Sequence, residues 1–90
     1  MQYEWDEAKR LSNIQKHGID FLGIDKVFAG QTITILDDRT DYGEPRFVTV
    51  GLLQGRVVVI AHTETDDVIR IISVRKATKH EEIGYFEIAH

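Results

Sequence analysis

The sequence predicts an α+β domain with two N-terminal helices, a four-stranded antiparallel meander sheet and a C-terminal helix. Up to about residue 30, apolar residues recur at the spacing of one helix face. Beyond that point, short segments rich in Val, Ile and Thr alternate with turn residues, which is typical of strands. The links between these segments are shorter than the dozen or so residues that a parallel crossover needs, so neighbouring strands should run antiparallel.

The first helix is expected over residues 6–17, with Asp6 as its N-cap and Gly18 at its C-terminal exit. Its buried stripe should be Trp5, Ala8, Leu11 and Ile14. A second, short helix should follow, capped by Asp20 and ended by Gly30. The residues that it is expected to bury are Phe21, Ile24, Val27 and Phe28.

Four strand segments come next, with the sequences TITILDD, RFVTVGLL, RVVVIAHTE and VIRIISVR. The third contains an unbroken apolar run over residues 57–61, and it should therefore be central and covered on both faces. The last helix should begin at a capping box formed by Thr78 and Glu81. Ile83, Phe86 and Ala89 then fall roughly along one face of that helix.

Composition predicts one globular domain over residues 1–90. No apolar run approaches the roughly 20 residues of a membrane helix, and the polar, acidic segment MQYEWDEAKR does not resemble a signal peptide. The absence of cysteine excludes disulfides and thiolate metal sites. We therefore expect a cytoplasmic protein that contacts no membrane.

Charge is unevenly distributed along the chain, whose net charge is −4. Residues 1–45 contain five basic and nine acidic side chains, whereas residues 46–90 contain six of each. The overall charge disfavours a general nucleic-acid binder. Four basic residues nevertheless gather in VIRIISVRKATK, where Arg70 stands in mid-strand. Such an arginine pairs with a carboxylate, is covered by its own stem, or lines a groove that meets a ligand, and the sequence leaves these alternatives open.

The direction of the basic side chains on the last strand decides whether they can act together. In an ideally alternating strand, Arg70 and Arg75 point to opposite faces. Both can serve one site only if the strand twists or bulges near Ser73, or if Arg75 already lies in the bend that leads to Thr78.

Three blocks of the sequence, YEWDEAKRLSNIQKHGIDF, DYGEPRFVTVGLLQGRVVVIAHTE and IRIISVRKATKHEEIGYFE, resemble the BrnT family of type II toxins and cover nearly the whole chain. The resemblance implies a fold like that of the RelE ribonuclease toxins, which inhibit translation by cutting RNA. It also implies neutralisation by a ribbon-helix-helix antitoxin of the BrnA type, with operator DNA bound only through the antitoxin complex. The chain departs from the family at Thr65 and around His80 and Glu82, where arginines are expected.

Metal-independent RNA cleavage requires a site to take a proton from the ribose 2′-hydroxyl, stabilise extra charge on the phosphate and protonate the leaving oxygen. The resemblance implies that Arg70 and Arg75 clamp the phosphate and that His17 or Tyr85 transfers the proton. The RNA-binding residues that it implies are Lys16, Arg46, Arg56, Lys76 and Lys79. No metal or other cofactor is expected.

Several basic and aromatic residues have structural alternatives. His17 can interact with the dipole of the first helix, Arg56 can be a solvated turn residue, and Tyr85 can be a core aromatic. Lys76 and Lys79 can simply neutralise carboxylates. A further histidine, in the buried strand at position 62, is expected to be an interior residue with satisfied hydrogen bonds.

Two other functions stay open. The segment LDDRTDYGE contains Asp37, Asp38, Asp41 and Glu44, whose carboxylates could bind a hard cation in a metal-dependent nuclease or a calcium loop. Asp and Gly are also what a turn between strands contains, and the spacing favours the turn. A non-catalytic interaction module, whose basic face binds an acidic partner segment, is the remaining alternative.

Overall fold

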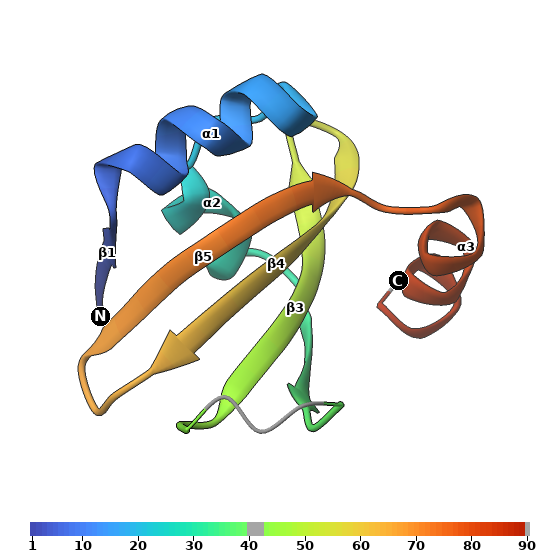
Figure 1. The fold of residues 1–90 in the computed structure, drawn as a ribbon. Coiled ribbons are helices and arrows are strands. Elements are labelled where there is room, and N and C mark those ends of the chain that lie inside the picture. Colours follow the sequence, from blue (N-terminus) through green and yellow to red (C-terminus); the bar gives the residue numbers. More distant parts are fainter. Residues whose placement is uncertain (40–42, 90) are drawn as a thin grey trace.

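A computed structural model describes residues 1–39 and 43–89 of the chain. The elements in chain order are β1 (Gln2–Trp5), α1 (Glu7–His17), α2 (Ile24–Ala29), β2 (Ile33–Asp37), β3 (Arg46–Leu53), β4 (Arg56–Glu64), β5 (Val68–Lys76) and α3 (Lys79–Ile88) (Figure 1). One five-stranded sheet has the order β1-β5-β4-β3-β2. The predicted α+β class is confirmed, and the seven predicted helices and strands follow one another in the expected order. No helix in the described part of the chain is long and apolar enough to cross a membrane.

The sheet contains one strand that the sequence did not predict. β1 pairs in parallel with β5, with Gln2 opposite Val68 and Trp5 opposite Ile71, so the sheet is mixed and has five strands. Four residues are too few for strand alternation to be recognised, and Trp5 also fits the apolar spacing of the helix that follows. The antiparallel pairing from β2 through β5 is confirmed.

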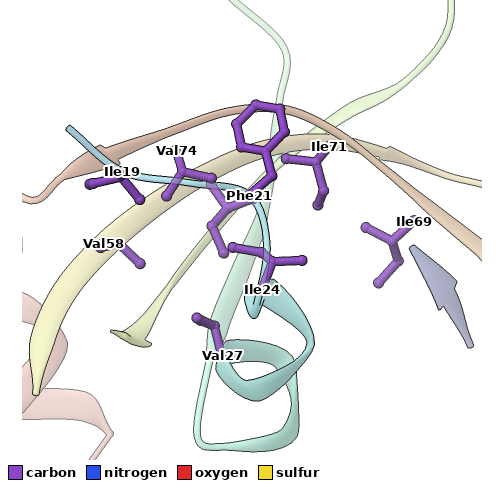
Figure 2. Close-up of a cluster of buried hydrophobic side chains, with 9 residues drawn as sticks. Ile19, Phe21, Ile24, Val27, Val58, Ile69, Ile71 and Val74 are labelled. Atoms are coloured by element: carbon purple, nitrogen blue, oxygen red, sulfur yellow. The ribbon is translucent and has the colours of Figure 1, made fainter. Parts of the chain in front are cut away.

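The core lies on both faces of β4, as predicted for a central strand. Val58 and Ile60 belong to the larger cluster, which α2 and the segment before it cover (Figure 2). Val57 and Val59 belong to a smaller cluster on the opposite face, together with Ala77 and Tyr85. Because α3 packs over only one end of that second face, the rest of it stays open.

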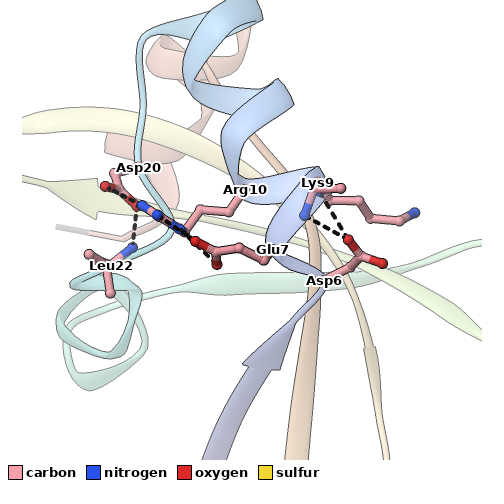
Figure 3. Close-up of polar contacts among 7 residues, drawn as sticks. Asp6, Glu7, Lys9, Arg10, Asp20 and Leu22 are labelled. Carbon is pink, nitrogen blue, oxygen red and sulfur yellow. Dashed lines mark hydrogen bonds and ion pairs between the residues drawn. The ribbon is translucent and has the colours of Figure 1, made fainter.

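The ends of α1 are as predicted, but its buried face is not. The Asp6 carboxylate accepts hydrogen bonds from the amides of Ala8, at 2.8 Å, and Lys9, at 3.3 Å (Figure 3). Gly18 ends the helix in the left-handed conformation. Leu11 is 55% exposed, and the buried residue of the helix is the polar Asn13. The predicted apolar stripe is therefore wrong at Ala8 and Leu11, whereas Trp5 packs against the core as expected.

Asn13 is buried because it takes the place of a missing strand. Pairing of β1 with β5 ends at Ile71, and beyond it the amide of Val74 donates to the Asn13 side-chain oxygen at 3.0 Å. The Asn13 side-chain nitrogen donates to the carbonyl oxygens of Val74 and Ile19, both at 2.9 Å. These bonds satisfy backbone groups that burial would otherwise leave unpaired.

Two details of α2 differ from the prediction. The helix begins at Ile24 after Gly23, so Asp20 is not its N-cap. The Asp20 carboxylate instead accepts from the amide of Leu22 and from the Arg10 guanidinium, which also pairs with Glu7 (Figure 3). The predicted buried residues are otherwise correct, since Phe21, Ile24 and Val27 are buried and Phe28 packs against them. Gly30 ends the helix as expected.

The capping box of α3 is confirmed. The amide of Glu81 donates to the Thr78 hydroxyl at 3.2 Å, and the amide of Thr78 donates to the Glu81 carboxylate at 2.8 Å. The expected apolar face is wrong in part: Ala89 packs against the smaller cluster, but Ile83 and Phe86 are about half exposed and Tyr85 is the residue that the helix buries. Helical spacing alone could not tell which side of this short helix meets the sheet.

A bulge in β5 changes the direction of its side chains. Ser73 pairs with Ala61, but the next residue of β4, His62, pairs with Ile71, so Ile72 is an extra residue in β5. As a result Val74, rather than Ser73, follows Ile69 and Ile71 into the larger core. Arg70 and Arg75 therefore both project from the other face of the sheet, away from the larger core.

Candidate functional site

A hollow of about 410 Å³ lies on the open face of the sheet. Its floor is made by Val48, Val59 and Ala61 of the two central strands. The remaining lining residues come from β2 and the turn after it, from β5 and from α3, and they are Ile35, Leu36, Asp37, Asp38, Arg39, Ser73, Arg75 and Glu81.

Arg75 is fixed at the edge of this hollow by the first turn of α3. Its Nη1 donates to Glu81 Oε1 at 2.7 Å and its Nη2 donates to Glu81 Oε2 at 2.8 Å. These bonds lower the pKa of the Glu81 carboxyl to about 2 and raise the pKa of Arg75. Because Glu81 also accepts from the Thr78 amide, the guanidinium is held in a defined orientation.

A second arginine–carboxylate pair lies at the other side of the hollow. Arg39 donates from Nε and Nη2 to the two oxygens of Asp37, both at 2.9 Å. These hydrogen bonds are the main cause of the lowered pKa of Asp37, and the charge of Arg46, its partner in the β2–β3 register, contributes further. The lining thus combines Arg39 and Arg75 with three carboxylates, so the hollow is not simply basic.

Arg70 lies on the same face as Arg75 but nearer to β1. Its Nη1 donates to Glu4 Oε1 at 3.1 Å, and both side chains are about half exposed. The carboxylate pairing that the sequence left open for Arg70 is therefore present in the structure. An exposed pair of this kind contributes little free energy, so it does not prevent Arg70 from binding another anion.

Lys16 and His17 lie together at a second hollow, of about 230 Å³, between the end of α1 and β5. The complete lining is Lys9, Ser12, Asn13, Lys16, His17, Ile72 and Ser73, which includes two lysines and no carboxylate. Ser73 lines this hollow and the larger one. The two hollows thus share one lining residue, which stands next to the bulge of β5.

The other candidate residues lie outside both hollows. Tyr85 is only 3% exposed, and its hydroxyl donates to the Gln31 carbonyl oxygen at 2.8 Å, so it is a core aromatic in this structure. Arg56 is exposed beside the β3–β4 turn, whose residues Gln54 and Gly55 both have positive φ. The exposed lysines 76 and 79 flank the link from β5 to α3.

His62 is an interior residue, as expected, but one of its nitrogens is not satisfied. Its Nε2 and the Thr49 hydroxyl are 2.7 Å apart, and its ring packs against Phe28 and Phe47. Within the described residues, Nδ1 is the one buried side-chain nitrogen or oxygen without a hydrogen bond, and it lies 3.6 Å from the Glu64 carboxylate. Burial lowers the pKa of His62.

The acidic segment was considered as a cation site from the sequence. Asp37 is engaged by Arg39, and Asp41 lies outside the described residues. Among residues 1–39 and 43–89, no three His or carboxylate side chains are grouped so that they could hold a metal ion.

Sequence reasoning missed two residues of the site. Arg39 stands among the acidic residues that drew attention as possible metal ligands, and its pairing with Asp37 gives it a place in the larger hollow. Asn13 occurs at a helix position where an apolar residue would signal burial. A polar residue that is buried because it bonds to a strand backbone cannot be found from the spacing of apolar residues in the sequence.

The fold and the hollows define a small α+β protein with one sheet face covered by helices and the other open around paired arginines. Residues 5–81 match the family model described as the ribonuclease toxin BrnT of type II toxin-antitoxin systems, and the chain belongs to this family. The resemblance inferred from the sequence is confirmed. Membership makes the chain a ribonuclease toxin and implies an RNA substrate and a cognate antitoxin. A search of curated proteins gives no significant match.

Proposed function

We propose that this toxin inhibits translation by metal-independent cleavage of RNA at the β5 bulge, beside the residue that lines both hollows. The observation that carries the proposal is the extra residue Ile72, which turns Arg70 and Arg75 to the same face. Ser73 beside it lines both the lysine-containing hollow and the arginine-containing hollow.

Arg70 and Arg75 are the phosphate-binding residues in this proposal, and Arg75 is the more firmly oriented of the two. Glu81 takes one hydrogen from each terminal nitrogen of Arg75, and the Lys76 carbonyl oxygen takes another from Nη1 at 3.3 Å. An arginine has five N–H donors, so the described contacts leave the Nε hydrogen and one Nη2 hydrogen for phosphate oxygens. A guanidinium that is already oriented stabilises developing negative charge without being reorganised during the reaction.

Proton transfer is assigned to His17. It is exposed at the end of α1 in the lysine-lined hollow, where the Lys16 side chain can bind a neighbouring phosphate. An imidazole ring has one nitrogen that can accept a proton and one that can donate it, which general acid–base catalysis needs. Tyr85 stays a second candidate, although its hydroxyl would first have to leave the Gln31 carbonyl. Arg46, Arg56, Lys76 and Lys79 then contact RNA outside the reacting phosphate.

The proposal also covers the kind of antitoxin that neutralises the toxin. The antitoxin is a ribbon-helix-helix protein of the BrnA type that covers the surface around Arg70, Arg75 and Lys79 with an acidic or amphipathic segment. Operator DNA is bound by the complex through the antitoxin. Loss of growth arrest when this antitoxin is produced with the toxin would support the assignment.

Cleavage of a single-stranded RNA by the purified chain, with and without EDTA, tests the chemistry. Arg70→Ala and Arg75→Ala should each lower the cleavage rate by two to three powers of ten, corresponding to roughly 3 kcal/mol of transition-state stabilisation. Lysine at either position should not restore the rate if both bind phosphate bidentately, because lysine keeps the charge but lacks the fork. Lys26→Ala is the control, because it also removes one positive charge but lies on the exposed surface of α2, on the side of the sheet that the helices cover. It should have little effect on the cleavage rate.

Circular dichroism and thermal melting of each variant must match the parent, because Arg75 also bonds to α3. Cleavage that EDTA abolishes would support the metal-dependent alternative. A chain that cleaves no RNA would support the interaction module. Arginine variants that fold normally and still cleave at the parental rate would show that the phosphate-clamp assignment is wrong.

A further inference from the structure

The outer edge of β2 is an exposed strand edge with apolar side chains. In the sheet order, β2 is the terminal strand on the side away from β1, so one of its two backbone edges faces no other described strand. Ile35 is 60% exposed and Leu36 is 55% exposed, and the two point to opposite faces of the sheet. Such an edge offers free N–H and C=O groups to another chain.

Proteins usually protect an edge of this kind, and the opposite edge of this sheet is protected. β1 is only four residues long, and its exposed side chains are the polar Gln2 and Glu4. In β2 no residue from Ile33 to Leu36 is charged, and none is proline. The exposed side chains of β1 are thus polar, whereas those of β2 include Ile35 and Leu36, and this difference indicates that β2 is kept available for pairing.

β2 also connects two recessed surfaces. At its N-terminal end, Gln31 lines an apolar groove of about 300 Å³ together with Leu52, Tyr85 and Phe86. Toward its C-terminal end, Ile35, Leu36 and Asp37 line the arginine-containing hollow. A strand laid along β2 would therefore run from the groove beside α3 to the candidate site.

We propose that an extended segment of the cognate antitoxin pairs with the outer edge of β2 and adds a sixth strand to the sheet. Two successive apolar residues of that segment pack against Ile35 and Leu36, one on each face, and an apolar side chain at one end occupies the groove beside Phe86. Backbone pairing supplies affinity and the side chains supply specificity. The other end of the segment reaches the hollow and excludes RNA from it.

This inference rests on the antitoxin that family membership implies and not on the proposed cleavage chemistry, so it can be tested without RNA. The probe is the cognate antitoxin, produced with the toxin and purified as the complex. Half of the amides of an edge strand point outward and exchange readily with solvent in the free chain. We expect amide exchange at residues 33–37 to slow by at least tenfold in the complex.

Substitutions at the edge provide a second measurement. Ile35→Lys and Leu36→Lys each introduce a lysine, the residue by which natural edge strands prevent pairing with another chain. Each should weaken antitoxin binding by about tenfold or more. Leu11→Lys is the matched control, because Leu11 is also 55% exposed but lies on α1, on the covered face. It should leave the affinity unchanged, and thermal melting should show that all three variants fold.

Each outcome decides the proposal. Slower exchange at residues 33–37 together with weaker binding by the two edge variants supports it. Unchanged exchange at these amides in the complex, or parental affinity of both edge variants, overturns it. Protection that appears in the toxin alone and depends on its concentration would mean that a second copy occupies the edge, which also overturns it. Failure of the RNA cleavage assay would leave these outcomes unaffected.

Discussion

Single side chains join the elements of this toxin at points where the backbone pairing stops. Asn13 is the clearest case, since it bonds to both backbone groups of Val74 where β1 no longer accompanies β5. Asn13→Ala would leave these groups and the Ile19 carbonyl without partners in a largely buried place. We expect the free energy of unfolding to fall by about 2–3 kcal/mol, measured by urea denaturation.

Two substitutions on α1 complete that test. Asn13→Leu should not recover the loss, because an apolar side chain fills space but cannot bond to Val74. Leu11→Ala, at the exposed position that the apolar spacing marked as buried, should change stability by less than about 1 kcal/mol. A larger effect at Leu11 than at Asn13 would contradict the assignment of the buried face.

The Arg75–Glu81 pair makes stability depend on pH in a defined window. The Glu81 pKa is about 2 in the folded chain, against an ordinary value of 4.5. Because the folded value is the lower one, the stabilisation is fully present above about pH 4.5 and is lost as the pH falls toward 2. For a partly exposed pair we expect about 1 kcal/mol at pH 7.

Glu81→Gln isolates this contribution, because glutamine keeps the side-chain length and removes the charge. The difference in free energy of unfolding between the parent and the variant should be about 1 kcal/mol at pH 7 and should shrink between pH 4.5 and pH 3. Denaturant titrations at several pH values measure it. A difference that stays constant over this range would mean that the pair does not stabilise the fold through the Glu81 charge.

At the scale of elements, helix ends and strands were easier to predict than the faces that helices bury. Asp6, Gly18 and the Thr78–Glu81 box act within a few residues, so the local sequence contains the whole signal. The burial of strand β4 could likewise be predicted, because its sequence contains an unbroken apolar run. The buried side of α3 is set by Tyr85 reaching the Gln31 carbonyl, which is 54 residues away in the sequence.

The contact between α2 and β3 depends on a glycine. A Cβ atom at Gly51 would lie 2.7 Å from the Val27 Cγ1 and 3.0 Å from the Thr32 Cγ2. Both neighbours are β-branched side chains with little rotamer freedom, so the helix must move. Gly51→Ala should lower the free energy of unfolding by about 1–3 kcal/mol, measured by thermal or urea denaturation.

Gly84 is the matched control for this substitution. It lies within α3, where a Cβ atom would meet nothing within 4 Å. Gly84→Ala should therefore stabilise the chain by about 0.5–1 kcal/mol, because alanine is the better helix former. Equal effects of the two substitutions would show that α2 does not pack as closely on β3 as the structure indicates.

For the whole molecule, the fold class and the family could be predicted from the sequence, and the geometry of the site only in part. The sequence stated the condition under which Arg70 and Arg75 share a face, but only the register of β4 against β5 revealed the extra Ile72. Such a bulge is set by pairing between strands. The carboxylate partners of Arg39, Arg70 and Arg75 could not be predicted either, because they come from tertiary placement.

Net charge gives a prediction for the molecule as a whole. The toxin carries −4, and the arginines at its larger hollow face carboxylates, so the isolated chain should bind duplex DNA weakly. The complex with its antitoxin should bind operator DNA with a clear salt dependence. Fluorescence anisotropy at about 50 and 200 mM salt measures both. Tight, salt-sensitive operator binding by the isolated toxin would contradict the assignment of DNA binding to the antitoxin.

The parallel pairing of β1 with β5 has a consequence for folding during synthesis of the toxin. Glu4 and Arg70 stand side by side although 66 positions separate them, and translation delivers residues one at a time, at about 5–20 per second. A nascent chain can form its helices early, but it cannot close the sheet until residues 68–71 have emerged, and Glu81 must follow before Arg75 is oriented. Contacts this distant in sequence also form slowly. The sheet and the orientation of Arg75 are therefore completed only after residues 68–81 have left the ribosome that makes this ribonuclease.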